Sequence, residues 1–150
     1  MKQLKILAMA VATGRIGYVY LLGNKLKDWG LSRKASKNAI LAGTQAHIWI
    51  DELAPDIVIT ENVPKSSTKS MKTRELIEAV ANAARNAHVL DVQVTKTHFF
   101  KNKYEEAAAL AERFPELTIW VPKMRRLWES EPRATVLFEA LALACVVIDG

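Results

Sequence analysis

The 150-residue chain is poor in the residue types that usually mark reactive or cross-linked sites. Its only cysteine is Cys145, so a disulfide within the chain is impossible and a zinc site built on cysteines is not expected. Its three histidines, His47, His88 and His98, show no spacing typical of a metal site. The sequence also contains no glycine-rich phosphate loop, nucleophile elbow or cysteine–histidine pair. Hydrolysis through a covalent nucleophile is therefore unsupported.

Long hydrophobic runs are missing as well. The apolar stretch near the N-terminus ends at Val11 and contains Lys5, so it is too short for a membrane span and unlike the hydrophobic region of a signal peptide. Cys145 lies in an apolar stretch over residues 141–148, where it is best interpreted as a buried small hydrophobe. We therefore expect a cytoplasmic protein that does not associate with a membrane.

The composition that remains is that of a folded domain. Half of the residues are hydrophobic and a quarter are charged, which is far from disordered or fibrous sequences. A chain of 150 residues without a visible linker or repeat predicts a single domain over residues 1–150. The formal net charge of +5 mildly favours polyanionic partners such as nucleic acids.

The hydrophobic pattern predicts three strands followed by alternating helices and strands. Apolar or alternating segments over 4–11, 16–22 and 25–31 predict an antiparallel trio, with Gly23-Asn24 as the second tight turn and the third strand as a half-exposed edge. Ser36 is the expected cap of a helix over 37–53, which Ala54-Pro55 ends. The remaining expected elements are strands over 56–60 and 89–95 and helices over 73–87, 104–114 and 134–147.

This order of elements predicts the fold and points to Glu61. Three antiparallel strands extended by two parallel strands through helical crossovers form the ribonuclease H-like arrangement. We therefore predict an α/β fold with a five-stranded mixed sheet in the order 3-2-1-4-5 and helices on both faces. Glu61 closes the fourth strand, at the edge where open α/β sheets place ligands and metals. Taken alone, Glu61 is more simply read as a solvated strand end.

Three segments resemble signature segments of one known family. Residues 10–17, AVATGRIG, are similar to the first-strand pattern Asp-x-Gly-Thr-x-Arg-Ile-Gly and match it at Thr13, Arg15, Ile16 and Gly17. Residues 55–61, PDIVITE, resemble the strand that ends in the second catalytic acid, and residues 138–144, FEALALA, resemble the final helix with its acid before an Ala/Leu run. The family is the RuvC/YqgF group of Holliday-junction resolvases. The resemblance covers nearly the whole chain in element order and implies the ribonuclease H-like fold.

The resemblance also implies a chemistry. Members of the group use several carboxylates to hold two divalent ions at a phosphodiester, and these ions stabilise the attacking and leaving oxygens. Carried over to this sequence, the catalytic residues and metal ligands would be Glu61 and Glu139, and the cofactor would be Mg²⁺ or Mn²⁺. Two carboxylates can hold one hydrated Mg²⁺, because that ion often keeps several waters.

The departures from the family pattern concern the same chemistry. Ala10 and Val136 stand where the family carries aspartates, and Ala12 stands where it carries a glycine. A site for two ions would therefore need other ligands. Glu129 and Glu131, just before the last helix, are the nearest candidates in sequence, although solvation at the surface is the more usual role for such residues.

Basic residues follow the predicted strands whose ends meet near Glu61. In the inferred fold they could straddle a phosphate backbone while Trp120 and Trp128 stack on bases. The alternative is a set of solvated loops with tryptophans that pack the last helix. The predicted nucleic-acid contacts are Arg15, Lys65, Lys69, Lys101, Lys103, Lys123, Arg125 and Arg126.

Two classes of function stay open. The first is a RuvC-like nuclease, a metal-dependent endonuclease that acts on branched DNA or structured nucleic acid. The second is a catalytically degenerate RuvC-like module that binds nucleic acid or a protein partner without cleavage. The absence of acids at positions 10 and 136 argues against catalysis and favours the binding module. The presence of Glu61 and Glu139 favours descent from the nucleases. A homodimer would suit the symmetry of a junction in either case.

Overall fold

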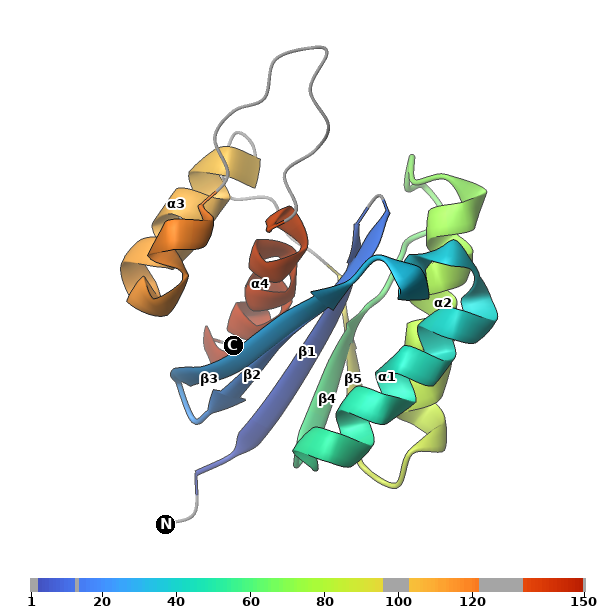
Figure 1. The fold of residues 1–150 in the computed structure, drawn as a ribbon, viewed down its shortest axis with the longest axis horizontal. Helices are drawn as coiled ribbons and strands as arrows, with labels where there is room; N and C mark the ends of the chain where they lie inside the picture. The colour runs from blue at the N-terminus through green and yellow to red at the C-terminus, as the bar shows by residue number, and fades with distance from the viewer. Residues whose placement is uncertain (1–2, 13, 96–102, 122–133, 150) are drawn as a thin grey trace.

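The computed structural model describes residues 3–12, 14–95, 103–121 and 134–149, and all structural statements below concern these residues. Its five strands form one sheet in the order β3-β2-β1-β4-β5, which confirms the predicted order (Figure 1). The strands are β1 (Lys5–Ala12), β2 (Arg15–Leu22), β3 (Lys25–Ser32), β4 (Ile57–Glu61) and β5 (Leu90–Val94). The helices are α1 (Ala39–Leu53), α2 (Met71–Asn86), α3 (Lys103–Arg113) and α4 (Thr135–Asp149), with short 3₁₀ turns η1 (Lys34–Lys37) and η2 (Pro115–Trp120).

Strand β1 lies at the centre of the sheet and fixes its register. It pairs antiparallel with β2, where Ala10 faces Gly17, and parallel with β4, where Ala8 faces Ile59. Tight turns at Gly14 and Gly23, both with positive φ, allow the chain to reverse between the first three strands. The edge position of β3 confirms the half-exposed strand that its alternating sequence predicts.

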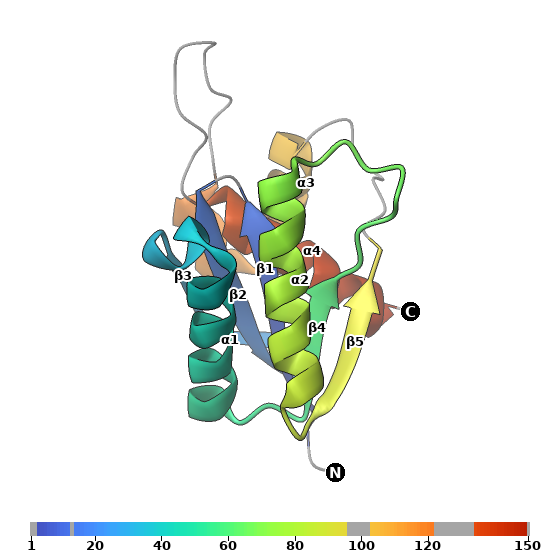
Figure 2. The same cartoon turned by 90° about the vertical axis from the view of Figure 1, so that its right-hand side faces the viewer.

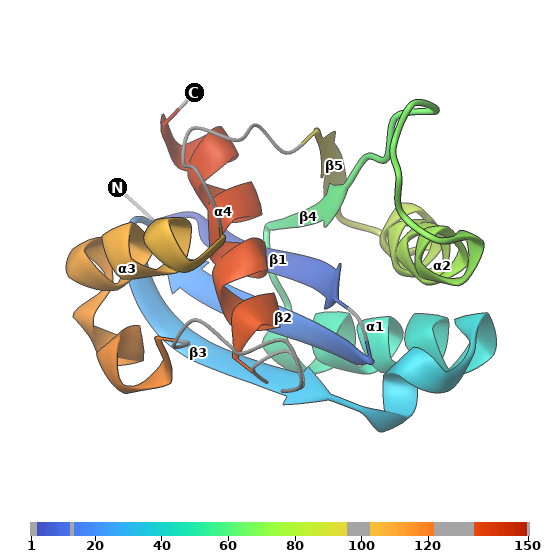
Figure 3. The same cartoon turned by 90° about the horizontal axis from the view of Figure 1, so that it is seen from above.

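Helices cover both faces of the sheet, as predicted. Figures 2 and 3 show α1 and α2 on one face and α4, with α3 beside it, on the other. Successive side chains of a strand point to opposite faces, so Ala8 and Ala10 of β1 belong to the core under α4, whereas Leu7 and Met9 belong to the core under α1 and α2. Within the described segments, the helices lack the combination of length and apolar character that a membrane crossing requires.

The start of α1 differs from the prediction. Ser36 does not cap the helix, because it is buried in η1 and its hydroxyl donates to the carbonyl oxygen of Arg33 at 2.7 Å. The cap is Asn38, whose side-chain oxygen accepts a hydrogen bond from the Leu41 N–H at 2.9 Å. The end was predicted correctly: Ala54 adopts a left-handed conformation and its N–H donates to the Ile50 carbonyl.

Candidate functional site

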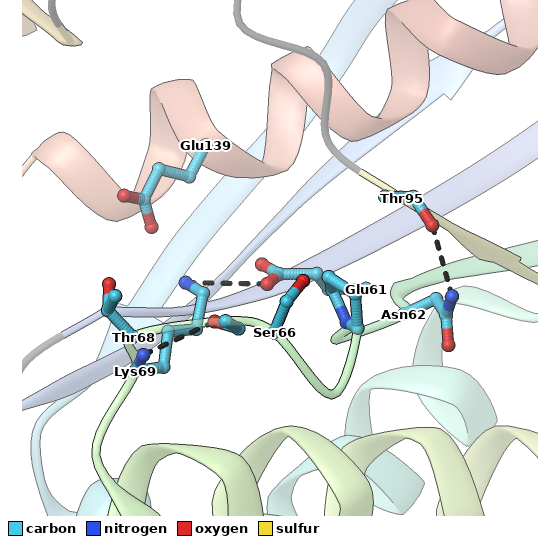
Figure 4. A pocket seen from close by; sticks show the side chains of 9 residues that line it. Glu61, Asn62, Ser66, Thr68, Lys69, Thr95 and Glu139 are labelled. Atoms are coloured by element: carbon cyan, nitrogen blue, oxygen red, sulfur yellow. Dashed lines mark hydrogen bonds and ion pairs between the residues drawn. The ribbon is translucent and has the colours of Figure 1, made fainter.

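A cleft opens at the carboxyl end of β4, between the loop over residues 62–70 and α4. Its volume is about 420 Å³. Figure 4 shows that it brings together Glu61 at the end of β4 and Glu139 of α4, the two acids that the sequence singles out. The residues that line the cleft are Glu61, Asn62, Pro64, Ser66, Ser67, Thr68, Lys69, Thr95 and Glu139.

Glu61 is almost buried and has a cationic partner. It lies on the same face of β4 as Ile59, which packs in the core under α4, and only 8% of its side chain is exposed. The Nζ of Lys69 lies 3.3 Å from Glu61 Oε2. A carboxylate this deeply buried is stable as an anion only when hydrogen bonds or an opposite charge compensate for the lost water. Lys69 supplies that charge.

The backbone of Lys69 is held in place from α2. The Nε of Arg74 donates to the Lys69 carbonyl oxygen at 3.1 Å, and its guanidinium also donates to the carbonyl oxygen of Ser67. The Lys69 N–H in turn donates to the Ser67 hydroxyl at 3.2 Å, and the next residue, Ser70, caps α2 through the Thr73 N–H. Arg74 is therefore used inside the loop, and the loop directs the Lys69 side chain into the cleft.

Glu139 enters the cleft from the opposite side. Its side chain is half-buried and points from the first half of α4 toward the loop that carries Lys69. In the view of Figure 4 the Lys69 ammonium group lies between the carboxylates of Glu61 and Glu139. On the far wall, Asn62 is tied to Thr95 by a side-chain hydrogen bond of 3.0 Å, which links the ends of β4 and β5.

The other side of the same sheet end is apolar. The parallel pairing of β1 with β4 extends to Ala8 and Ile59, and Ala10 and Glu61 each lie two residues beyond this last pair, on the same face of the sheet. Ala10 is 1% exposed and Val136 is 0% exposed. A Cβ atom added to Gly17, the partner of Ala10 on β2, would lie 2.7 Å from a methyl carbon of Val136. The two positions at which the family resemblance expects aspartates are thus part of the close-packed core.

The donor set of the described residues does not fit a centre for two divalent ions. The described residues contain no group of three or more His, Cys, Asp or Glu side chains that could hold a metal ion. Glu61 and Glu139 remain, and Glu61 is already paired with Lys69. Glu129 and Glu131, the possible additional ligands, lie outside the described residues.

The predicted nucleic-acid contacts are only partly described by the structure. Lys65 is exposed in the loop after β4, Arg15 is half-buried at the start of β2, and Lys69 is turned toward Glu61. Lys103 begins α3, and Trp120 ends η2 with 40% of its surface exposed. Lys101, Lys123, Arg125, Arg126 and Trp128 lie outside the described residues.

Three exposed basic residues at the same end of the sheet as the cleft were missed at the sequence level. Arg33, Lys34 and Lys37 are exposed in or next to η1, directly after β3. Because Ser32 of β3 pairs with Ile16 of β2, η1 lies at the same end of the sheet as Glu61. The sequence feature that could have identified them is the run of basic residues directly after the third predicted strand.

Other titratable groups give no alternative site among the described residues. His47 and His88 are exposed, and His98 lies outside the described part of the chain. Cys145 is half-buried rather than fully buried, and its burial raises the pKa of the thiol to about 11. The thiol is therefore protonated near neutral pH and acts as a packing group.

Comparisons by sequence gave no match, either to a family model or to a curated protein. Solved structures do match. The fowlpox virus resolvase in its Holliday junction complex has a TM-score of 0.66 at 14% identity, with 97% of each chain covered. RuvC from Thermus thermophilus has a TM-score of 0.61 at 15% identity, with 93% of this chain and 90% of that chain covered. The yeast mitochondrial Holliday junction resolvase has a TM-score of 0.51 at 12% identity, with 95% and 78% covered.

At sequence identities this low, structural matches establish the fold and nothing further. The matches extend over almost the whole chain and agree with the strand order β3-β2-β1-β4-β5. The family resemblance of the three short motifs is therefore confirmed at the level of architecture: this chain has the RuvC-like, ribonuclease H-type fold of the Holliday junction resolvases.

Proposed function

We propose that this protein binds branched DNA, with the four-way junction as its preferred form, at the carboxyl end of its sheet. Two solved structures of the same fold, those of the fowlpox virus resolvase and of Thermus thermophilus RuvC, are complexes with Holliday junction DNA. The observation in this chain that carries the proposal is a group of exposed basic side chains at the sheet end that carries the cleft.

These basic residues lie on two sides of the sheet end. Arg33, Lys34 and Lys37 follow β3, whereas Lys65 and Lys72 lie in the loop after β4 and in the first turn of α2. Figure 2 shows η1 and the loop on either side of the N-terminal end of α2. Cations in this arrangement can contact phosphates of two separate DNA arms, and such contacts fix position without reading sequence.

Cleavage is the second candidate function. It is favoured by one observation, that Glu61 and Glu139 line the same cleft. In this version the two acids bind Mg²⁺ or Mn²⁺, and the protein is an endonuclease on branched DNA or structured nucleic acid. Ala10 and Val136 leave the neighbouring positions without ligands. We therefore expect binding to be retained and cleavage to be feeble or absent.

A homodimer belongs to the same proposal. A four-way junction has two-fold symmetry, and a symmetric pair of protomers would present two basic sheet ends to opposite arms. Sedimentation of the free protein and of its junction complex measures this state directly.

Binding is tested with a fluorescent four-way junction and a linear duplex of the same arm sequence, in EDTA and over a range of salt. We expect tighter binding of the junction and a steep loss of affinity with salt. Lys34→Glu/Lys37→Glu should lower junction affinity by about tenfold or more, since each lost phosphate contact removes counterion release. The matched control is Lys25→Glu/Lys27→Glu, which makes the same charge change at the opposite end of β3. Equal losses for both pairs, or equal affinity for junction and duplex, would refute the proposal.

Cleavage is tested on the same junction with Mg²⁺ or Mn²⁺, comparing wild type with Glu61→Gln. Robust cleavage that Glu61→Gln removes would establish the nuclease. Robust cleavage that survives Glu61→Gln would place the active site elsewhere, and no metal-dependent product in either protein is the outcome we expect of a binding module.

A further inference from the structure

We infer that Lys69 is the resident cation of the cleft and that its ammonium group occupies the position between Glu61 and Glu139 that a divalent ion would otherwise take. The inference deepens the proposed function, since it concerns the same cleft and gives a physical reason for DNA binding without hydrolysis. It rests on four features: the ion pair, the way the loop is held, the charge of the cleft and the apolar side next to it.

The ion pair is the direct observation. Lys69 Nζ lies 3.3 Å from Glu61 Oε2, and 35% of Lys69 but only 8% of Glu61 is exposed. A partner for a carboxylate this buried is costly to remove, because water in the cleft replaces the lost cation only in part. Lys69 therefore does more for Glu61 than a lysine at an open surface does for its partner.

The loop prepares this pair in advance. A long lysine side chain at a surface loses conformational freedom when it is held in one geometry, and this loss often cancels the gain of an ion pair. Here Arg74 and Ser67 hold the backbone on both sides of the Lys69 peptide. Ser70 then starts α2 immediately after it. Part of the ordering cost is thus met by the fold of the loop, and the ammonium is directed into the cleft.

The charge of the cleft opposes a divalent ion. Among the described residues that line it, Glu61, Glu139 and Lys69 are charged, and the Lys69 ammonium offsets part of the negative charge of the two carboxylates. Mg²⁺ gives up its water reluctantly and is held in proteins by carboxylates. A divalent ion entering beside Lys69 would meet a like charge as well as a weakened anionic site.

The apolar side prevents the ion from binding farther in. Ala10 and Val136 are 1% and 0% exposed and provide no ligand atoms next to Glu61. Within the described part of the chain, the carboxylate ligands for a divalent ion are therefore confined to the side of the cleft that Lys69 occupies. In this proposal Lys69 serves the cleft, whereas the sequence predicted a contact with nucleic-acid phosphates.

The test is a titration with Mn²⁺ in the absence of DNA, followed by calorimetry and by the electron paramagnetic resonance signal of free Mn²⁺. Lys69→Met keeps most of the unbranched side chain and removes the ammonium group with its charge. We expect it to bind Mn²⁺ at least about tenfold more tightly than wild type, which corresponds to removing a competing ion pair of about 1.4 kcal/mol. The matched control is Lys65→Met, an exposed lysine of the same loop, which should bind like wild type.

The added Mn²⁺ binding should depend on the two acids. Lys69→Met/Glu61→Gln and Lys69→Met/Glu139→Gln should both lose it. Mn²⁺ should also raise the melting temperature of Lys69→Met while leaving that of wild type unchanged, because a ligand stabilises only the state that binds it. If Lys69→Met folds poorly, Arg74→Gln frees the loop without removing the lysine charge, and we expect a smaller gain in Mn²⁺ affinity.

Two results would overturn the inference: wild type that binds Mn²⁺ as tightly as folded Lys69→Met, or a gain in affinity that survives loss of either acid. Junction binding in EDTA is independent of these titrations. Failure of the junction assay with the Mn²⁺ result intact would remove the proposed function alone, and the reverse outcome would remove the Lys69 inference alone.

Discussion

The two sides of the sheet end around Glu61 are made from neighbouring strands but held together by different forces. On the side of β1 and β2, Ala10, Gly17 and Val136 exclude water and pack at contact distance. On the side of β4 and β5, Glu61 is balanced by Lys69 in a water-accessible cleft. The first side is therefore sensitive to size and charge, and the second to charge alone.

The difference has a topological cause. Strand β1 is the central strand and α4 lies across it, so a side chain at its carboxyl end faces the helix directly. Strand β4 is followed by a loop that leaves the sheet, and the space beside Glu61 stays open. A single sheet end can thus keep a polar site on one strand while the next strand becomes core.

Ala10→Asp should give the largest effect, because it places a charge on the packed side. A buried carboxylate without a partner costs about 3–5 kcal/mol, and here it would also lie on the strand next to that of Glu61 and on the same face of the sheet. We expect that loss in the free energy of unfolding, measured with urea in EDTA. Mn²⁺ should restore part of the stability, because a third carboxylate improves the donor set.

Ala12→Asp is the matched control for Ala10→Asp. It makes the same change on the same strand at a half-buried position near the strand end, and it should cost much less. An Ala10→Asp protein as stable as wild type would show that the β1 side is not close-packed.

The contact between Gly17 and Val136 should behave as a coupled pair. Gly17→Ala adds a methyl group that would lie 2.7 Å from Val136, and overpacking of this kind costs about 1–3 kcal/mol. Val136→Ala removes two methyl groups from the core at a similar cost. The double variant should be more stable than the sum of the two losses predicts, by about 1 kcal/mol, as measured by urea unfolding of all four proteins.

Gly43→Ala is the control, because this glycine-to-alanine change should raise the free energy of unfolding instead of lowering it. A Cβ atom at Gly43 of α1 would meet Ala79 at an ordinary 3.7 Å, and alanine is the better helix former by about 1 kcal/mol.

Strict additivity of Gly17→Ala and Val136→Ala would show that the two residues are not in contact.

On the polar side, loss of charge should cost less than on the packed side. Lys69→Met leaves Glu61 without its cation, but the cleft admits water, so we expect a loss of about 1–2 kcal/mol in EDTA. Glu61→Gln in the Lys69→Met background should recover most of it, since the unpaired charge is gone. A loss as large as that of Ala10→Asp would mean that this side is as dry as the other.

The smallest effect is expected away from both sides, at the ion pair between Arg113 of α3 and Asp149 of α4. Two hydrogen bonds of 2.8 Å join the groups, but both are largely exposed, so Asp149→Asn should cost only about 0.5 kcal/mol at neutral pH. The hydrogen bonds from Arg113 lower the pKa of Asp149. Because the pKa is lowered in the folded state, the ionised Asp149 stabilises the fold at pH values above the ordinary aspartate pKa of about 4. This stabilisation is lost as the pH falls through the lowered pKa. The difference between the two proteins should therefore vanish in acid.

The fold was predictable because its signals are periodic and local. The apolar segments ending at Val11 and Glu61 and the turn at Gly23 define strands without reference to the rest of the chain. The strand order then follows from chain connectivity. The cap of α1 was assigned to Ser36 instead of Asn38 because both residue types cap helices and only the tertiary position of η1 decides between them.

The site was less predictable because its decisive contacts have no periodicity. Glu61 and Glu139 were found through strand position and family motif, and the structure does bring them to one cleft. The partnership of Lys69 with Glu61 depends on the irregular loop that Arg74 holds, and nothing in the sequence distinguishes Lys69 from Lys65. Likewise, the contact of Gly17 with Val136 joins β2 to a helix more than a hundred residues later in the chain.

That contact between Gly17 and Val136 also has an evolutionary consequence. A lineage starting from this chain would need new acids at both Ala10 and Val136 to gain a full ligand set, and each substitution alone places a charge in the packed core. Selection for stability acts against either intermediate before any catalytic benefit exists. The interdigitated β2–α4 contact therefore makes a full carboxylate set at this sheet end accessible only through at least two changes at once, whereas exposed basic positions can change one at a time.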